Sequence, residues 1–262
     1  MWGIARAFRG RVLLRIEDHD RTRFRPEYAS AILEDLSWLG FVPDFPVLRQ
    51  SERRARYEER LSELGSAGLV YPCACSRKKV AAVLGSSEGE VRYPGTCRDL
   101  RLDGAAHAAR RVRFDSVVVG FNDLRLGWIE QIPADQTGDI LVRDRHGHWT
   151  YQFAVVVDDS DQRVDLVIRG EDILSSTGRQ IQLARLLGRE KPPAFLHHPL
   201  ITHPDGVKLS KANRDTGIRE LRAGEWNKER VLGAAAMALG IGTGEPLRFD
   251  DIVATIEKTG RA

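Results

Sequence analysis

Three short apolar runs in the chain each end in charged residues, and this pattern constrains the fold more than any other feature. Residues 13–16 lead into Glu17, residues 151–157 lead into two aspartates, and residues 167–168 lead into Arg169 and two further acids. A run of this kind is typical of a buried strand that delivers polar side chains at its C-terminal edge. The pattern favours an α/β fold.

Helix and turn signals lie between these runs. Ser51 is a candidate N-cap for a helix that would bury Tyr57, Leu61 and Leu64 on one face. Residues 139–157 are expected to form a hairpin that returns to the main sheet. The remaining signals predict a strand over residues 12–16 and helices over residues 27–39, 177–187 and 228–239.

Two lysines flank a serine in a loop that follows the sequence His-Pro-Asp-Gly. Lys208 and Lys211 suit the task of clamping the phosphates of ATP, because lysine is a compact point charge that can follow a moving phosphoryl group. Exposed basic turns are common, so the tetrapeptide by itself is a weak signal. It gains weight from the segments that precede it.

All three cysteines lie within a short stretch of the chain. Reduced thiols that cluster in this way are more typical of a metal site than of a disulfide. The one-residue spacing of Cys73 and Cys75, with Cys97 beyond, leaves a tetrahedral Zn²⁺ one ligand short. Tyr93 can supply the fourth ligand, and His107 is an alternative; three unrelated thiols are the competing interpretation.

Composition sets wider limits. The 262 residues can bury a sizeable core, and the net charge of +3 is a mild basic excess. Only seven of the 40 basic residues are lysine, and the arginines that make up the rest suit bidentate phosphate contacts. A nucleic-acid partner is therefore permitted. No stretch of 18 apolar residues and no signal peptide is found, so a cytoplasmic protein without membrane association is expected.

Taken in order, the three acidic segments and the lysine loop resemble the class I aminoacyl-tRNA synthetases of the glutamyl type. The nearest likeness is to the glutamyl-queuosine tRNA(Asp) synthetases, which are short paralogues without an anticodon-binding domain. Only 262 − 211 = 51 residues follow Lys211, too few for that domain. The resemblance runs from about Trp2 to about Leu239, nearly the whole chain.

The resemblance implies an α/β fold, with a Rossmann-type parallel sheet, a zinc-binding insertion and a short helical C-terminus. Residues 1–70 would form an incomplete first catalytic half, and residues 71–136 would form the insertion. Residues 137–224 would form the second catalytic half, and residues 225–262 the helical end. A monomer is expected.

The resemblance also implies roles for individual residues. Glu17 would face the α-ammonium of glutamate, Tyr151 would close one wall of the pocket, and Arg169 would grip the side-chain carboxylate. An arginine in an apolar strand needs a partner, which favours function for Arg169 even without the family. Asp18 and Asp20 are expected to be solvated, and His197 and His198 to pack and cap a strand. ATP with Mg²⁺ would meet Asp172, Lys208 and Lys211, with Lys211 catalytic, and one Zn²⁺ would bind Cys73, Cys75, Tyr93 and Cys97.

The implied chemistry has two steps. Glutamate attacks the α-phosphate of ATP to give glutamyl-adenylate, without any need for tRNA, and the glutamyl group then passes to the queuosine of tRNA(Asp). Positioning and charge neutralisation would carry the rate, because little covalent chemistry is asked of the protein.

The chain departs from the family at its start, where it has no His-Ile-Gly-His-type motif. About 30 to 40 residues of the family pattern are missing, judged from the size of a typical βα unit. Their loss would leave neighbouring strands unpaired, so the 262-residue chain is expected to be poorly stable and nearly inactive. Two alternatives are a non-catalytic zinc-containing tRNA-binding remnant and a fragment of an ordinary glutamyl-tRNA synthetase.

Overall fold

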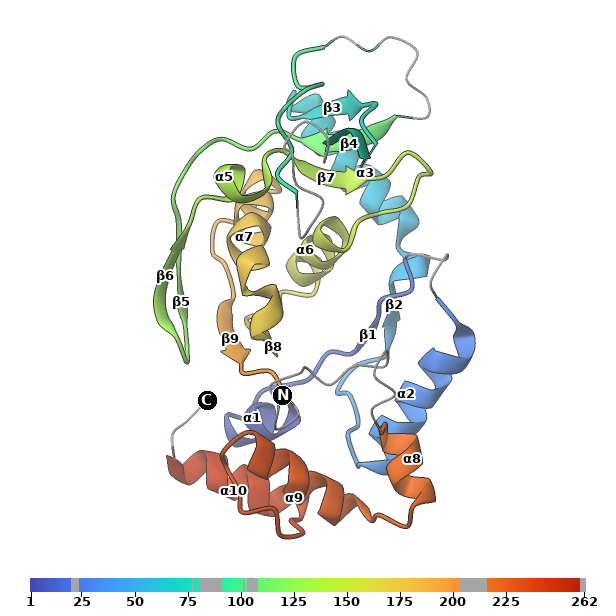
Figure 1. The fold of residues 1–262 in the computed structure, drawn as a ribbon, viewed down its shortest axis with the longest axis vertical. Coiled ribbons are helices and arrows are strands. Elements are labelled where there is room, and N and C mark those ends of the chain that lie inside the picture. The colour runs from blue at the N-terminus through green and yellow to red at the C-terminus, as the bar shows by residue number, and fades with distance from the viewer. Residues whose placement is uncertain are drawn as a thin grey trace.

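The computed structural model describes residues 1–19, 24–76, 78–80, 91–100, 102, 108–202 and 216–259. Figure 1 shows an upper body of sheets and helices above a lower helical layer, joined by extended segments that carry β1 and β2. Within the described residues, no helix is both long enough and apolar enough to cross a membrane.

A four-stranded mixed sheet with the order β6-β5-β9-β8 forms one part of the upper body. Strands β8, β9 and β5 run parallel, and β6 is an antiparallel edge strand joined to β5 by a hairpin. The predicted α/β fold is confirmed, with one antiparallel strand added to the expected parallel set. The strands are β5 (Val119–Asp123), β6 (Gly127–Gln131), β8 (Leu166–Gly170) and β9 (Ala194–His198).

Helices pack beside this sheet, and one of them replaces a predicted strand. Tyr151–Asp161 is helix α6, so the second strand of the expected hairpin over residues 139–157 is wrong; only a single antiparallel bridge joins Arg143 to Trp149. Residues 153 to 158 of α6 are all buried, and an apolar run that is buried on every side has no periodicity to distinguish a helix from a strand. The helix predicted over residues 177–187 is confirmed. The associated elements are α5 (Pro133–Thr137), η2 (Glu171–Ser176) and α7 (Thr177–Leu186).

A three-stranded antiparallel sheet, β3-β4-β7, lies at the top of Figure 1. Its strands are β3 (Val70–Cys73), β4 (Ala109–Val112) and β7 (Ile140–Arg143). Strand β7 pairs with β4 and not with the main sheet. Two strand pairings therefore cross the expected boundary at residue 136. Strand β7, from the expected second catalytic half, pairs with β4 of the expected insertion, and β5, from the expected insertion, pairs with β9 of the second half.

The segment before the upper body contains a separate two-stranded parallel sheet. Strand β1 (Arg15–Ile16), shorter than predicted, pairs with β2 (Leu48–Arg49), and among the described residues neither strand bonds to the four-stranded sheet. Helix α3 (Arg54–Ser66) buries Tyr57, Leu61 and Leu64, as predicted. Ser51 does not cap it, because it lies in η1 (Gln50–Glu52) and donates to Asp18 instead.

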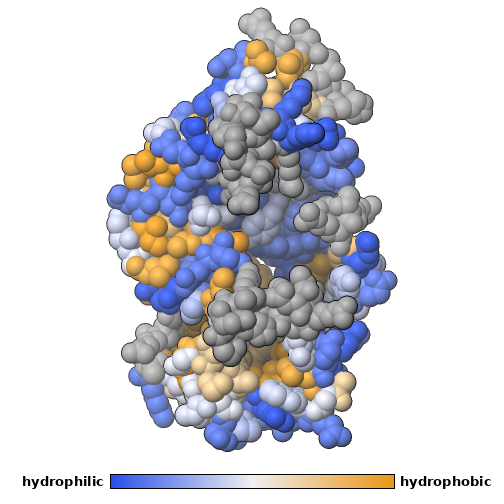
Figure 2. Space-filling view, in the orientation of Figure 1, coloured by the Kyte–Doolittle hydropathy of each residue, from blue (hydrophilic) through white to orange (hydrophobic). Residues whose placement is uncertain are grey.

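The lower layer is helical. Helices α1 (Trp2–Ala7), α9 (Lys228–Ala238) and α10 (Phe249–Thr259) pack together, and α8 (Ile218–Ala223) contacts α2 (Pro26–Trp38). The helix predicted over residues 228–239 is confirmed. Its buried face includes Val231 and Leu232, whereas Ala235, Ala238 and Leu239 are exposed. Figure 2 shows this face of the molecule hollowed near its middle, between the upper body and the lower layer.

Candidate functional site

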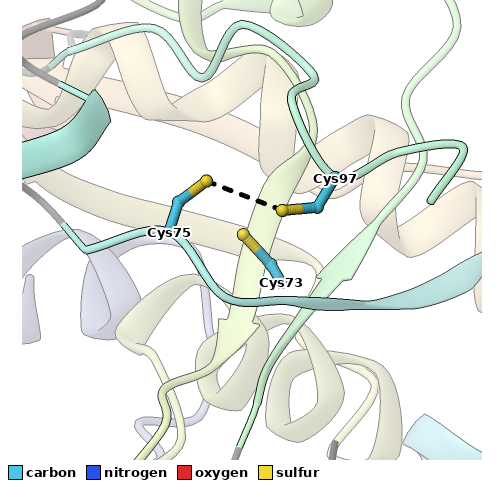
Figure 3. A group of neighbouring side chains, drawn as sticks. All are labelled: Cys73, Cys75 and Cys97. Atoms are coloured by element: carbon cyan, nitrogen blue, oxygen red, sulfur yellow. Dashed lines mark hydrogen bonds between the residues drawn. The ribbon is translucent and has the colours of Figure 1, made fainter. Parts of the chain in front are cut away.

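The thiols of Cys73, Cys75 and Cys97 converge where β3 ends (Figure 3). Their three Sγ atoms all lie within 4.8 Å of one another, and those of Cys75 and Cys97 are 3.6 Å apart. A tetrahedral zinc with Zn–S bonds of about 2.3 Å holds its sulfurs about 3.8 Å apart. The spacing of the thiols therefore fits a single zinc ion.

Tyr93 points its hydroxyl into the same cluster. The Tyr93 Oη lies 3.4 Å from Cys73 Sγ and accepts the backbone N–H of Cys97 at 2.8 Å. Burial raises the pKa of Tyr93, and burial together with the neighbouring Cys97 raises that of Cys75 to about 11. For Cys73, burial favours a higher pKa, but hydrogen bonds with Tyr93 and other neighbours outweigh it and lower the pKa. The donor set fits a Zn²⁺ site, and the alternative ligand, His107, lies outside the described residues.

Sequence reasoning missed a cation beside this cluster. The guanidinium of Arg111 lies 3.7 Å from the centre of the Tyr93 ring, and its Nη1 donates to the carbonyl oxygen of Asp139 at 2.7 Å. Zinc held by several thiolates carries a net negative charge. If zinc binds here, Arg111 is placed to offset that charge, as residues just outside a metal's ligands do.

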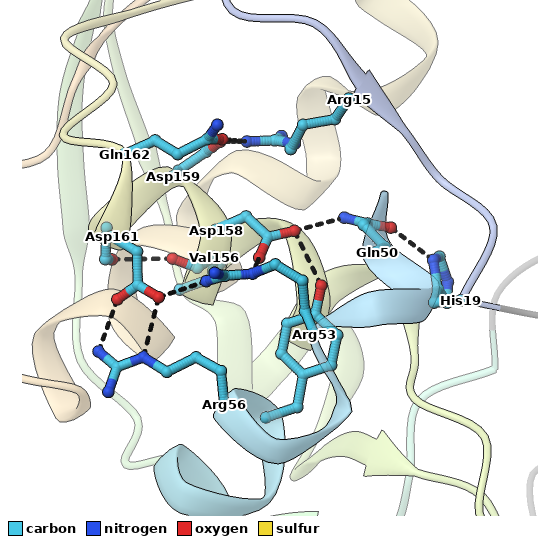
Figure 4. Close-up of polar contacts among 12 residues, drawn as sticks. Arg15, His19, Gln50, Arg53, Arg56, Val156, Asp158, Asp159, Asp161 and Gln162 are labelled. Carbon is cyan, nitrogen blue, oxygen red and sulfur yellow. Dashed lines mark hydrogen bonds and ion pairs between the residues drawn. The ribbon is translucent and has the colours of Figure 1, made fainter. Parts of the chain in front are cut away.

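A buried carboxylate, Asp158, joins α6 to the segment that carries β1 and β2 (Figure 4). Its side chain is fully buried and accepts from the Tyr57 hydroxyl at 2.9 Å, from Gln50 Nε2 at 2.7 Å and from Arg53 Nε at 2.8 Å. Gln50 Oε1 in turn lies 2.6 Å from His19 Nδ1. Asp158 thus fixes the residues that lie just beyond the candidate substrate residue Glu17.

Asp18 is also buried, contrary to the expectation that it is solvated. Only 3% of it is exposed, and it accepts hydrogen bonds from both the backbone N–H and the hydroxyl of Ser51, each at 2.8 Å. Asp18 therefore orients the turn between β2 and α3. Asp20 lies outside the described residues.

Glu17, Tyr151 and Arg169 come together from three different elements. Glu17 follows β1, Tyr151 begins α6, and Arg169 lies on β8. Burial raises the pKa of Tyr151, with Glu17 the next cause and the Arg169 cation acting in the opposite direction. Glu17 is exposed, yet crowding by the surrounding protein raises its pKa, against the lowering effect of Arg15. Glu17 and Arg169 are therefore each close enough to Tyr151 to act on its pKa.

Arg169 is a half-buried cation that is held by neutral groups. Its Nη1 donates to Gln180 Oε1 at 2.6 Å, and its Nη2 donates to Thr177 Oγ1 at 2.6 Å. Its Nε donates to His197 Nε2 at 3.1 Å. Burial is the leading cause that lowers the pKa of Arg169, while Tyr151 and the carboxylates of Asp159 and Asp123 act to raise it. Among the described residues, none of its hydrogen-bond partners is a carboxylate.

The predicted ATP residues are only partly visible. Asp172 lies exposed in the first turn of η2, where its Oδ1 approaches Gly170 so closely that a Cβ at that glycine would be 2.5 Å away. Lys208 and Lys211 lie outside the described residues. The structure therefore places Asp172 two residues after β8, near Arg169, and does not describe the lysine loop.

The sequence interpretation also missed the group that supports Arg169. His197 lies on β9 directly opposite Arg169 on β8, and Asp123 ends the neighbouring strand β5. Both side chains are fully buried, with His197 Nδ1 2.7 Å from Asp123 Oδ2. No sequence signal could have paired two residues that lie 74 positions apart.

Known proteins resemble the chain over most of its length. A family model described as tRNA synthetases class I (E and Q), catalytic domain, matches residues 1–245. A protein of Verminephrobacter eiseniae named glutamyl-Q tRNA(Asp) synthetase is 45% identical over 257 residues, which cover 95% of this chain and 84% of that protein. One of the same name from Leptothrix cholodnii is 42% identical over 253 residues, covering 92% and 82%.

A solved structure has the same fold. The glutamate tRNA ligase of Elizabethkingia meningosepticum aligns with a TM-score of 0.78 at 23% identity. The alignment covers 96% of this chain, which spans 59% of the length of that ligase.

Proposed function

The chain belongs to the class I tRNA synthetases (E and Q), and from this premise we propose that it activates L-glutamate with ATP and transfers the glutamyl group to the queuosine of tRNA(Asp). The relatives named glutamyl-Q tRNA(Asp) synthetase support the choice of acceptor. Activation would proceed without tRNA.

The observation that carries the proposal is the environment of Arg169. A cation removed from water is costly unless an anion compensates it, and the described hydrogen-bond partners of Arg169 are all uncharged. The carboxylates of Asp159 and Asp123 act on Arg169 without a direct hydrogen bond, and a carboxylate ligand would supply that direct contact through a bidentate pair with the guanidinium. The side-chain carboxylate of glutamate meets this need, whereas the amide of glutamine does not.

The other two residues would hold the rest of the amino acid. Glu17 would offer a carboxylate to the α-ammonium, and Tyr151 would close one wall of the pocket, near enough to Glu17 and Arg169 for both to alter its pKa. This arrangement leaves the α-carboxylate of glutamate free to react. Its oxygen would attack the α-phosphorus of ATP while the bond to the β-phosphate breaks, which releases pyrophosphate.

ATP with Mg²⁺ would lie near Asp172 and the lysine loop, with Lys211 and Lys208 neutralising the charge on the phosphates. In the second step, a hydroxyl of queuosine would attack the glutamyl carbonyl and release AMP. These assignments rest on the family resemblance of residues 208–211 and on the place of Asp172 just after β8.

A zinc ion would be held by Cys73, Cys75, Tyr93 and Cys97 in a structural role. Such an ion contributes folding free energy by tying together segments that have little core of their own. In this chain it would tie the end of β3 to the loop that contains Cys97, beside the antiparallel sheet.

Glutamate binding is the direct test, since it probes the surroundings of Arg169 without the later steps. Calorimetry of the 262-residue chain should show glutamate binding, no binding of glutamine, and loss of glutamate binding in Arg169→Met. Arg185→Gln, an exposed arginine at the end of α7, is the matched control and should bind like the parent chain.

Absence of glutamate binding to the folded parent chain would refute the proposal. Pyrophosphate exchange that depends on both ATP and glutamate, measured alongside in the absence of tRNA, would support activation without tRNA. Mass spectrometry of tRNA(Asp) nucleosides would then identify the acceptor.

A further inference from the structure

The paired side chains of Asp123 and His197 lie directly behind Arg169. Asp123 Oδ2 contacts His197 Nδ1 at 2.7 Å and accepts the His197 backbone N–H at 3.0 Å. Asp123 Oδ1 accepts the backbone N–H groups of Arg125 and Leu126 at 3.0 and 2.9 Å. Burial alone would raise the pKa of Asp123, but these hydrogen bonds, His197 first among them, lower it, so the carboxylate is ionised.

An ionised carboxylate can only accept hydrogen bonds, and this decides the tautomer of His197. Its Nδ1 must carry the proton that faces Asp123. Burial lowers the pKa of His197, so the ring is neutral and its Nε2 has a free lone pair. That lone pair faces Arg169 Nε–H at 3.1 Å and the Thr177 hydroxyl at 3.1 Å.

The hydrogen bonds around Arg169 are then mutually consistent. Thr177 Oγ1 accepts from Arg169 Nη2 at 2.6 Å and donates its own proton to His197 Nε2. The opposite tautomer would set an Nε2–H against Arg169 Nε–H, two donors in contact. The guanidinium would have to turn away from its present plane.

We propose that Asp123 and His197 are positioning residues for the recognition of glutamate, acting through Arg169. Asp123 selects the His197 tautomer, His197 holds the Nε edge of Arg169, and the remaining N–H groups of the guanidinium stay available to the substrate carboxylate. The inference rests on the proposed function, in which Arg169 grips that carboxylate. Such a series of carboxylate, histidine and arginine favours a ligand with a negatively charged carboxylate, because a bidentate contact requires that the plane of the guanidinium is fixed.

The test uses Asp123→Asn. The amide oxygen should take the Oδ1 position, which accepts the N–H groups of Arg125 and Leu126. The amide nitrogen should then take the Oδ2 position and donate to His197 Nδ1. The His197 tautomer would therefore invert. Asp144→Asn is the matched control, because Asp144 also pairs with a histidine, His148 Nδ1 at 3.1 Å, and accepts two backbone N–H groups away from Arg169.

Two readouts are measured on each protein. Long-range ¹H–¹⁵N spectra of the imidazole rings, assigned with His197→Gln, report the tautomer, and calorimetry reports the affinity for glutamate. The parent chain and Asp144→Asn should show the Nδ1–H tautomer at His197 and equal affinity. Asp123→Asn should show the Nε2–H tautomer and bind glutamate about 10-fold more weakly or worse, as expected when a hydrogen bond to a charged group is lost.

An Nε2–H tautomer at His197 in the parent chain would overturn the inference, and so would an inverted tautomer in Asp123→Asn with unchanged affinity. If Asp123→Asn does not fold, Thr177→Val replaces it: glutamate should bind several-fold more weakly while the tautomer stays as it is. Unchanged affinity in Thr177→Val would then count against the inference. A parent chain with the Nδ1–H tautomer and no glutamate binding would refute the proposed function, and with it the role in recognition.

Discussion

At the scale of single residues, the Arg111 cation lies beside the side chains of the cysteine cluster. Arg111 packs against the ring of Tyr93, while the hydroxyl of Tyr93 lies beside Cys73 and Cys97. A zinc ion with three thiolates and a phenolate would carry two negative charges, and the Arg111 guanidinium would offset one of them. In the proposed zinc site, Tyr93 would therefore act both as a ligand and as the aromatic surface against which Arg111 packs.

Tyr93→Phe should weaken zinc binding about 10-fold or more, because the site loses an oxygen ligand and keeps only three thiols. Competition with a coloured chelator measures the affinity. Tyr71→Phe is the control: it removes another buried phenol in the same module, one that donates to Asp139 at 2.7 Å and not to the cluster. Equal zinc affinity in Tyr93→Phe and the parent chain would exclude Tyr93 as a ligand.

The lowered pKa of Asp161 leads us to expect that the free energy of unfolding depends on pH. Burial would raise its pKa, but hydrogen bonds from Arg56 and Arg53 outweigh this effect and lower it. Arg56 contacts it twice, at 2.8 and 2.6 Å. Because the folded pKa is lower than the unfolded one, the stabilising contribution is present above the unfolded pKa and is lost as pH falls through the folded value.

Acid titration of thermal unfolding should therefore show stability falling below about pH 4, the ordinary range of an aspartate. Asp161→Asn should be less stable than the parent chain at neutral pH, and the difference between them should shrink as the pH falls. A difference that stays constant down to pH values well below this range would show that Asp161 does not contribute through its charge.

At the scale of elements, a tight turn connects α5 to β7 and supports the cysteine cluster. Gly138 has φ +66°, a conformation that favours glycine, and a Cβ there would lie 2.0 Å from the carbonyl oxygen of Tyr93. The Tyr93 N–H also donates to Thr137 O at 2.8 Å. The turn thus holds the backbone of Tyr93 in place.

Gly138→Ala should cost about 1–2 kcal/mol for the backbone conformation and about 1–3 kcal/mol for the steric clash, and it should weaken zinc binding as well. Gly127→Ala separates the two effects, since Gly127 has φ +79° but open space where the added methyl group would lie. Chemical denaturation measures both variants. Similar losses of stability in the two would show that the contact with Tyr93 is unimportant.

Helix α6 shows where element prediction from local sequence stops. Its apolar residues are buried on all sides, so they carry no 3.6-residue period, and the pattern predicted a strand. Helix α3, in contrast, has one buried face, which its spacing of Tyr57, Leu61 and Leu64 predicted correctly.

At the scale of the whole molecule, the segment with β1 and β2 is joined to the upper body largely by polar contacts. Its two strands form their own sheet, and Asp158 on α6 accepts hydrogen bonds from Gln50, Arg53 and Tyr57. Arg15 reaches Asp159 at 2.5 Å in the same region (Figure 4). These contacts decide where Glu17 lies relative to Tyr151 and Arg169.

Asp158→Ala should destabilise the protein by about 3 kcal/mol or more, because removing one partner of a buried ion pair leaves the other groups unsatisfied. Glutamate affinity should fall as well, since Glu17 would no longer be held against α6. Denaturation and calorimetry test the two effects. Asp165→Ala, an exposed acid between α6 and β8, is the control and should change neither. Full glutamate affinity in a folded Asp158→Ala protein would show that the network does not position Glu17.

The sequence by itself determined the features that depend on neighbouring residues. The spacing of Cys73, Cys75 and Cys97 indicated a metal site, apolar periodicity predicted α3, and an arginine in an apolar strand marked Arg169. Each signal lies within a stretch of 25 residues or fewer, where the types and spacing of residues can be read directly.

Only the tertiary structure decided which distant segments meet. It paired Asp123 with His197, buried Asp18 and Asp158, joined β7 to β4, and made residues 151–161 a helix. The physical reason is that burial and strand pairing are properties of the packed chain. From sequence alone a carboxylate is expected to be solvated, because the hydrogen-bond donors that make its burial favourable come from distant segments of the folded chain.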